Sequence, residues 1–235
     1  MIETLYGKTF MILGFQLGVT WLSTVCLIGL FRRLYLRYQV EWVDGQPDAD
    51  GNLNLDLNWE VVKPYFWTLL ITNFMLFLAL MFYGTTNLYI GIPLFTFWSV
   101  LTGFELALCL ISVDENLGGR VLALTALITV AAGLIGAKSG IDFYFLDGIL
   151  FFSLLLLIIF GFIRIFYSIP RWGQRVAAFF GVVVFTGYLL YDFNRLSAMN
   201  KNAAANTWGN AMEISISIYL DIINLFLDLL DLLSN

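Results

Sequence analysis

Long runs of apolar residues follow one another along the chain, and each is long enough to cross a bilayer as a helix, which takes about 20 residues. Short connections join most of them, so the pattern predicts one compact, all-α domain of seven membrane helices over residues 1–235. The predicted spans are Phe10–Phe31, Tyr65–Tyr83, Leu88–Ser112, Val121–Ala137, Phe143–Phe166, Val176–Asn194 and Met212–Leu233.

The connection between the first two spans is long and has a pattern of its own. In residues 38–62 apolar and polar residues alternate, as in Leu53–Trp59, around a turn-rich segment at residues 44–51. Alternation on both sides of a turn predicts a β-hairpin. Its acidic residues favour a position in water, on the surface of the membrane.

The tip of this hairpin resembles the start of an EF-hand loop, with oxygen ligands at Asp48, Asp50 and Asn52. An EF-hand needs glycine at its sixth position and glutamate at its twelfth. Here Gly51 stands at the fourth position and Trp59 at the twelfth. The sequence therefore favours a solvated acidic hairpin over a calcium site.

The last predicted span carries a polar stripe on an otherwise apolar helix. Ser217, Asp221, Asn224, Asp228 and Asp231 follow one another at steps of four, three, four and three, which places them on one helical face. A carboxylate in the middle of a membrane helix costs about 2.5–3.5 kcal/mol on insertion scales. Asp221 therefore needs a partner, a cation or a proton.

Helix geometry predicts a second carboxylate close to Asp221. If the last connection runs from about Ala198 to about Asn210, the rise of 1.5 Å per residue places Asp192 about 9 Å and Asp221 about 15 Å from the same membrane face. Antiparallel neighbouring helices then bring the two carboxyl groups within reach of each other. They cannot both ionise cheaply in a low dielectric, so one keeps its proton and the pair forms a proton-operated latch.

Other polar residues in the spans are candidates for an ion pathway. Glu105 is a third member of the acidic cluster or a pore-lining acid, and its alternative, as for Asp221, is a structural hydrogen bond to a neighbouring helix. For Asp147 the sequence favours neither a role in the ion pathway nor a purely structural role. For Asp192, Asp228 and Asp231 the alternative is a carboxylate that faces water at a helix end, and this alternative is favoured for Asp228 and Asp231. The predicted pathway residues are Glu105, Asn224, Asp228 and Asp147.

The composition is typical of a protein that is embedded in the lipid bilayer. Hydrophobic residues make up 60% of the chain and charged residues 12%. The net charge of −5 does not favour binding to nucleic acid, which is negatively charged. The chain has no histidine, which excludes histidine-based catalysis and His-ligated haem or zinc. Cys26 and Cys109 lie inside predicted spans, and we expect no disulfide between them.

Several motifs resemble those of a known family. The run Ser217–Phe226 is similar to the last-helix signature of the transmembrane Bax inhibitor motif family, and Gly187–Asp192 is similar to its sixth-helix motif. Leu101–Gly103 and Ile135–Lys138 resemble further landmarks of the family. The resemblance extends from about Leu88 to the last residue. It implies a seven-helix bundle whose last helix is central and enclosed by the other six.

Members of that family are described as pH-sensitive calcium leak channels. Two aspartates on the last two helices share a proton and, with an arginine from the region of the second helix, hold the pore shut. The resemblance places this pair at Asp192 and Asp221. Residues 83–87, where the arginine is expected, contain no basic residue. The resemblance therefore implies a latch of carboxylates alone, or one that borrows Arg195 or Arg164.

The leading hypothesis is a passive, non-enzymatic cation pathway that is gated by protonation of the aspartate pair. Calcium is the predicted transported species, with Asp192 and Asp221 as transient ligands, because calcium prefers carboxylate oxygens. We expect no bound cofactor. The alternative is a non-conducting regulator of a membrane protease or a cell-death partner, since bacterial relatives of the family include a protease modulator.

A third hypothesis is an intramembrane aspartyl protease, which also uses two carboxylates. It is disfavoured because that class needs glycines just before its second aspartate, whereas bulky Ile218, Tyr219 and Leu220 precede Asp221 here. For the location, the hairpin and the lack of a basic C-terminal tail favour a bacterial inner membrane. An endoplasmic reticulum or Golgi membrane is the alternative.

Overall fold

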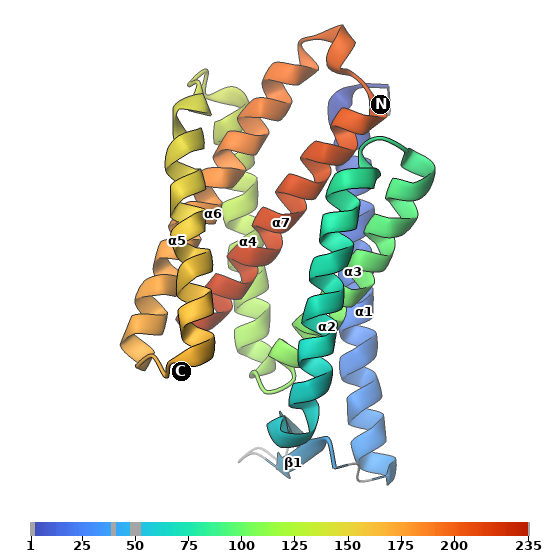
Figure 1. Cartoon of the computed structure of the whole chain (residues 1–235), viewed down its shortest axis with the longest axis vertical. Helices are drawn as coiled ribbons and strands as arrows, with labels where there is room; N and C mark the ends of the chain where they lie inside the picture. The colour runs from blue at the N-terminus through green and yellow to red at the C-terminus, as the bar shows by residue number, and fades with distance from the viewer. Residues whose placement is uncertain (1–2, 39–40, 48–52, 235) are drawn as a thin grey trace. The chain divides into compact units, whose positions relative to one another are not determined.

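The computed structural model describes residues 3–38, 41–47 and 53–234. Asp48, Asp50 and Asn52, which resemble the start of an EF-hand, lie outside the described residues. The described part contains seven long α-helices and one pair of strands (Figure 1). In chain order they are α1 (Leu5–Tyr38), β1 (Val43–Pro47), β2 (Leu53–Leu57), α2 (Trp59–Ala79), α3 (Leu88–Leu110), α4 (Glu115–Lys138), α5 (Asp147–Phe166), α6 (Arg171–Asn200) and α7 (Trp208–Leu233).

Three short helical turns supplement these helices. A π-helical turn, η1 (Leu80–Gly84), continues α2, a 3₁₀ turn, η2 (Phe143–Leu146), leads into α5, and a second 3₁₀ turn, η3 (Ala203–Ala205), stands between α6 and α7. The predicted spans fall on these elements, but several helices are longer than predicted. The apolar pattern marks only the part of a helix suited to lipid, whereas backbone hydrogen bonding continues into polar ends.

Six of the described helices are long and apolar enough to cross a membrane: α1, α2 with η1, α3, α4, α5 with η2, and α6. The protein is therefore an all-α, multi-pass membrane protein. The helix that does not meet this measure is α7, which carries Asp221, Asp228 and Asp231 within eleven residues. Its membrane crossing stays a prediction.

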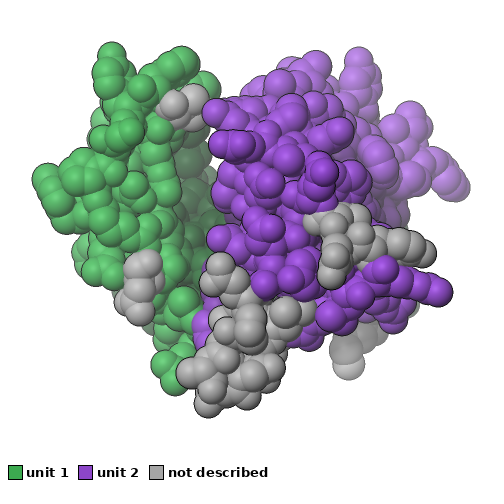
Figure 2. All heavy atoms as spheres, turned by 90° about the horizontal axis from the view of Figure 1, so that it is seen from below, with its two compact units in different colours: residues 1–10, 115–235 green, residues 11–114 purple. Residues whose placement is uncertain are grey.

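The chain divides into two compact units, which Figure 2 colours green and purple. Unit 1 comprises residues 1–10 and 115–235, and unit 2 comprises residues 11–114. Each unit has its own internal packing.

In unit 1, α6 packs against α4, α5 and α7, and α7 also packs against α4. Glycines allow the close approach of α4 to α6. A Cβ atom at Gly136 would lie 3.1 Å from Cβ of Phe193, and one at Gly133 would lie 3.2 Å from the Phe193 ring. The start of α1 belongs to this unit as well, because Ser215 of α7 donates to the backbone oxygen of Thr9 over 3.0 Å. In this unit α6 is therefore in contact with three helices, α4, α5 and α7.

In unit 2, polar side chains join α1 to α3. Ser99 donates to Gln16 over 3.0 Å, and Gln16 in turn donates to Thr96 over 3.1 Å. One and two turns further along α1, Thr20 donates to the Ser99 backbone oxygen over 3.3 Å and Thr24 to that of Gly103 over 3.0 Å. These bonds satisfy side chains that would otherwise be costly in an apolar environment.

The predicted β-hairpin is present. β1 and β2 pair in antiparallel register, with Val43 opposite Leu57 and Gly45 opposite Leu55. Val43, Leu55 and Leu57 are buried in a core with Val62, Leu108 and Ile111 of the unit 2 helices. Asp44 and Asp56, which alternate with these apolar residues, are exposed. The hairpin therefore has one apolar face on the helices and one face with exposed carboxylates, of which Asp56 accepts a hydrogen bond from Ser112, just after α3, over 2.7 Å.

We predict that Gly103→Ala destabilises the protein by about 1–3 kcal/mol, because the site is already filled. A Cβ atom there would overlap Ser23 Oγ and lie 2.6 Å from the Thr20 backbone oxygen. The measurement is thermal unfolding in detergent. Gly18→Ala is the matched control, since a Cβ atom at Gly18 meets nothing within 4 Å. Equal melting temperatures for the two variants would contradict this packing of α1 on α3.

Candidate functional site

The structure brings Asp192 of α6 and Asp221 of α7 together. The two helices pack against each other within unit 1 (Figure 1). Asp192 is 4% exposed and Asp221 is 6% exposed. Their side chains lie within hydrogen-bonding reach of each other. The two carboxyl groups form a buried contact, at the place where helix rise along α6 and α7 predicts it.

The hydrogen bonds around this contact indicate that the pair of carboxyl groups would be stabilised by a proton. Oδ2 of Asp221 is buried, and no hydrogen-bond donor among the described residues serves it. A buried polar atom without a partner costs about 1–3 kcal/mol. Ionised carboxylates only accept hydrogen bonds, whereas a protonated one also donates. A single proton on the pair would turn the contact between two acceptors into a hydrogen bond.

Arg195 lies one turn after Asp192 on α6, and its charge acts on that carboxyl group. Its own ion pair is with Glu213 of α7. The structure thus places one of the two predicted basic partners beside the pair, and adds an acidic residue to the site. Glu213 is not among the residues predicted from the sequence, although it precedes Ser217 and Asp221 at steps of four and so extends the polar stripe of α7 by one turn.

Tyr188 is a further neighbour that sequence analysis missed. It lies one turn before Asp192 on α6 and is close enough to interact electrostatically with Asp192, Asp221 and Asp147. The spacing of four residues between Tyr188 and Asp192 is the signal that places both on one face. Asp147 itself is the first residue of α5 and is exposed.

Arg164, the other predicted basic partner, lies elsewhere in unit 1. It forms an ion pair of 2.9 Å with Asp231, and Arg171 forms a second one of 3.0 Å with the same carboxylate. Arg171 also donates to the backbone oxygen of Ser234 over 2.6 Å. Asp231 is ten residues after Asp221, or about 15 Å along the helix. The two arginines therefore hold the C-terminal end of α7.

Two other predicted residues lie on α7 between these points. Asn224 donates over 2.9 Å to the backbone oxygen of Leu220 in its own helix. The carboxyl group of Asp228 faces Gly181 of α6, where a Cβ atom would come within 2.5 Å of the carboxyl carbon. The stripe of α7 therefore runs along α6 from Asp221 to Asp228.

Glu105 belongs to a separate polar cluster in unit 2. Asn73 of α2 donates through Nδ2 to Glu105 Oε2 and, over 3.4 Å, to Thr102 Oγ1. Oε1 of Glu105 and Oδ1 of Asn73 are buried, and neither has a hydrogen-bond partner among the described residues. Across the described ranges of the chain, no group of three or more His, Cys, Asp or Glu side chains is arranged to hold a metal ion.

Comparison with known proteins identifies the family. Residues 3–235 match the family model described as Bax1-I, the inhibitor of apoptosis-promoting Bax1. The chain belongs to this family. Plant proteins called LIFEGUARD are among the relatives of the chain, and the Bax inhibitor assignment expected from α6 and α7 is confirmed.

Curated relatives of the Bax inhibitor family match parts of the chain. LIFEGUARD 1 of Arabidopsis thaliana is 29% identical over 168 residues, which is 61% of this chain and 68% of that protein. A BI1-like protein of the same plant is 38% identical over 97 residues, 41% of this chain and 36% of the relative. A membrane protein of Streptococcus pyogenes serotype M6 is 25% identical over 143 residues, 60% of this chain and 61% of that one. The chain thus spans little more than a third of the BI1-like protein's length.

We predict that Asn73→Leu destabilises the protein by about 1–3 kcal/mol, because it leaves the Glu105 carboxyl group without a donor. The double variant Asn73→Leu/Glu105→Leu should be more stable than the sum of the two single effects, since replacing both partners removes the unsatisfied group. Thermal unfolding in detergent measures each variant. Thr72→Leu, at the exposed neighbouring position on α2, is the control. Additive effects would contradict the coupling of Asn73 to Glu105.

Proposed function

We propose that this protein forms a pH-sensitive calcium leak pathway through its membrane, gated by protonation of Asp192 and Asp221. The observation that carries the proposal is the buried contact between these two carboxyl groups. Membership in the Bax inhibitor family supports it. A bacterial inner membrane is the proposed location, with an endoplasmic reticulum or Golgi membrane as the alternative.

The proposed gate follows from the chemistry of two close carboxyl groups. With one proton between them, they form a charge-assisted hydrogen bond, which is stronger than a bond between neutral groups. The bond joins α6 to α7. Without the proton, two negative charges lie side by side in a low dielectric, where their repulsion is many times stronger than in water. The pair then separates or takes up a cation.

Calcium suits this change of charge. Two carboxylates supply the hard oxygen ligands that calcium prefers, and the divalent ion neutralises both. In the proposal calcium is cargo that passes Asp192 and Asp221. Asn224 and Asp228 continue the proposed pathway one and two turns along α7, and Glu105 and Asp147 are further candidates. A central α7 within a seven-helix bundle is part of the same proposal.

A second candidate function is a non-conducting regulator that binds a membrane protease or a cell-death partner. The observation that favours it is the description of the matched family as an inhibitor of apoptosis-promoting Bax1. The two candidates differ in one measurable property, which is whether purified protein alone makes a bilayer permeable to calcium.

We predict that proteoliposomes with the purified protein show calcium flux that changes between about pH 5 and about pH 8, and that Asp192→Asn and Asp221→Asn remove this dependence. The reason is that an amide donates a hydrogen bond to the remaining carboxylate at every pH in this range. A calcium-sensitive dye inside the vesicles reports the flux. An unchanged pH profile in both variants would exclude the aspartate latch.

Asp142→Asn is the matched control for this experiment. Asp142 lies in unit 1, is exposed, and caps η2 by accepting from the Tyr144 backbone N–H over 3.0 Å. Asparagine caps equally well, so the control removes one carboxylate without changing the fold. Its pH profile should match the wild type. No flux above empty vesicles at any pH, combined with specific binding of a membrane protease, would favour the regulator.

A further inference from the structure

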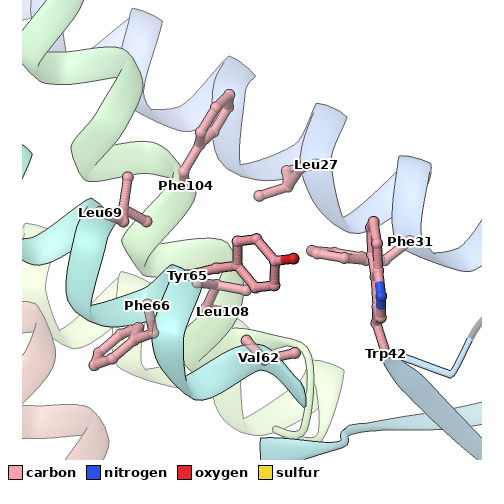
Figure 3. A pocket seen from close by; sticks show the side chains of 9 residues that line it. All are labelled: Leu27, Phe31, Trp42, Val62, Tyr65, Phe66, Leu69, Phe104 and Leu108. Carbon is pink, nitrogen blue, oxygen red and sulfur yellow. The ribbon is translucent and has the colours of Figure 1, made fainter.

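Unit 2 contains an apolar pocket of about 330 Å³ (Figure 3). Its walls come from α1, α2 and α3, and Trp42, just before β1, stands at one side. Val62 and Leu108 belong both to the pocket wall and to the core that holds the hairpin. The packed hairpin therefore fixes one end of the pocket.

The residues that line the pocket indicate that its ligand is apolar. Every side chain that lines the pocket is aliphatic or aromatic. Water in such a space finds too few hydrogen-bond partners to be stable. The volume lies at the lower end of the range of about 300–1,000 Å³ for small-molecule sites. A flexible hydrocarbon chain meets both conditions.

The rim of the pocket has the character of a membrane interface. Tyr65 is 68% exposed and Trp42 is 46% exposed, with 6.4 Å between their ring centroids. In Figure 3 the Tyr65 hydroxyl points toward Phe31 and Trp42. No hydrogen bond among the described residues uses the Tyr65 hydroxyl or the Trp42 indole N–H. Aromatic residues with one polar atom favour the headgroup level of a bilayer.

A basic residue stands beside the same rim. Lys63 lies between the lining residues Val62 and Tyr65 on α2 and is exposed. The carboxylate of Asp56 in the hairpin accepts a hydrogen bond from Ser112 over 2.7 Å. A negatively charged headgroup complements Lys63.

We propose that this pocket holds one acyl chain of an anionic phospholipid from the surrounding bilayer, with the lipid phosphate at Lys63. The chain fills the apolar space, the Tyr65 hydroxyl and the Trp42 N–H bind oxygens of the headgroup region, and Lys63 selects for negative charge. The site lies in unit 2 and makes no use of the aspartate pair of unit 1, so the lipid proposal and the calcium proposal stand or fall separately.

The test is native mass spectrometry of the full chain, extracted in mild detergent from vesicles with equal amounts of phosphatidylglycerol and phosphatidylcholine that carry the same acyl chains. We expect a complex with one phospholipid, enriched about fivefold in phosphatidylglycerol, since one basic residue at a membrane surface contributes about 1 kcal/mol. Equal retention of the two lipids would overturn the role of Lys63.

Variants separate this site from general lipid contact. Leu69→Trp fills the pocket from α2 and should abolish the complex, while Ile71→Trp, at a 62% exposed position on the same helix, should keep it. Lys63→Gln should keep the complex and lose the preference for phosphatidylglycerol. If Leu69→Trp fails to fold, Leu27→Phe fills the pocket from α1 instead. Equal lipid retention in the filled variant and in Ile71→Trp would overturn the proposal.

Discussion

The contact between Asp192 and Asp221 can exist only if α6 and α7 are held close along their length. Each carboxyl group is buried, and a buried polar group needs a hydrogen-bond partner. Their helices are held by features at some distance from the pair. Glycines on α4 let that helix come close to α6, and the arginines that bind Asp231 hold the far end of α7. The position of the pair thus depends on most of unit 1.

Much of this arrangement was predictable from the sequence because helices and strands have fixed periods. The steps of three and four residues placed Asp221 and Asp228 on one face of α7, and that face lies along α6. The rise per residue placed Asp192 at a comparable depth. Alternation around a turn gave the hairpin. Each of these inferences uses only local geometry.

What the sequence could not provide is the choice of partners between elements distant along the chain. Arg164 and Arg195 were equal candidates for the aspartate pair, and only the packing of α5, α6 and α7 assigns Arg164 to Asp231 and Arg195 to Glu213. The pairing of Glu105 with Asn73 likewise depends on the side-by-side packing of α2 and α3. The apolar pocket lies where the hairpin packs against helices that are distant in the sequence. No local sequence pattern predicts a pocket at such a place.

The two ends of the acidic stripe show two ways to accommodate a carboxylate. At the C-terminal end of α7, Asp231 is partly exposed and receives two arginines, whose charges also oppose the negative end of the helix dipole. Ten residues earlier, Asp221 is buried, and a full ion pair there would require the desolvation of an arginine as well. A proton neutralises a buried carboxylate without a second buried side chain. The carboxylates that distinguish α7 from the six apolar helices therefore also make it the helix on which a proton can act.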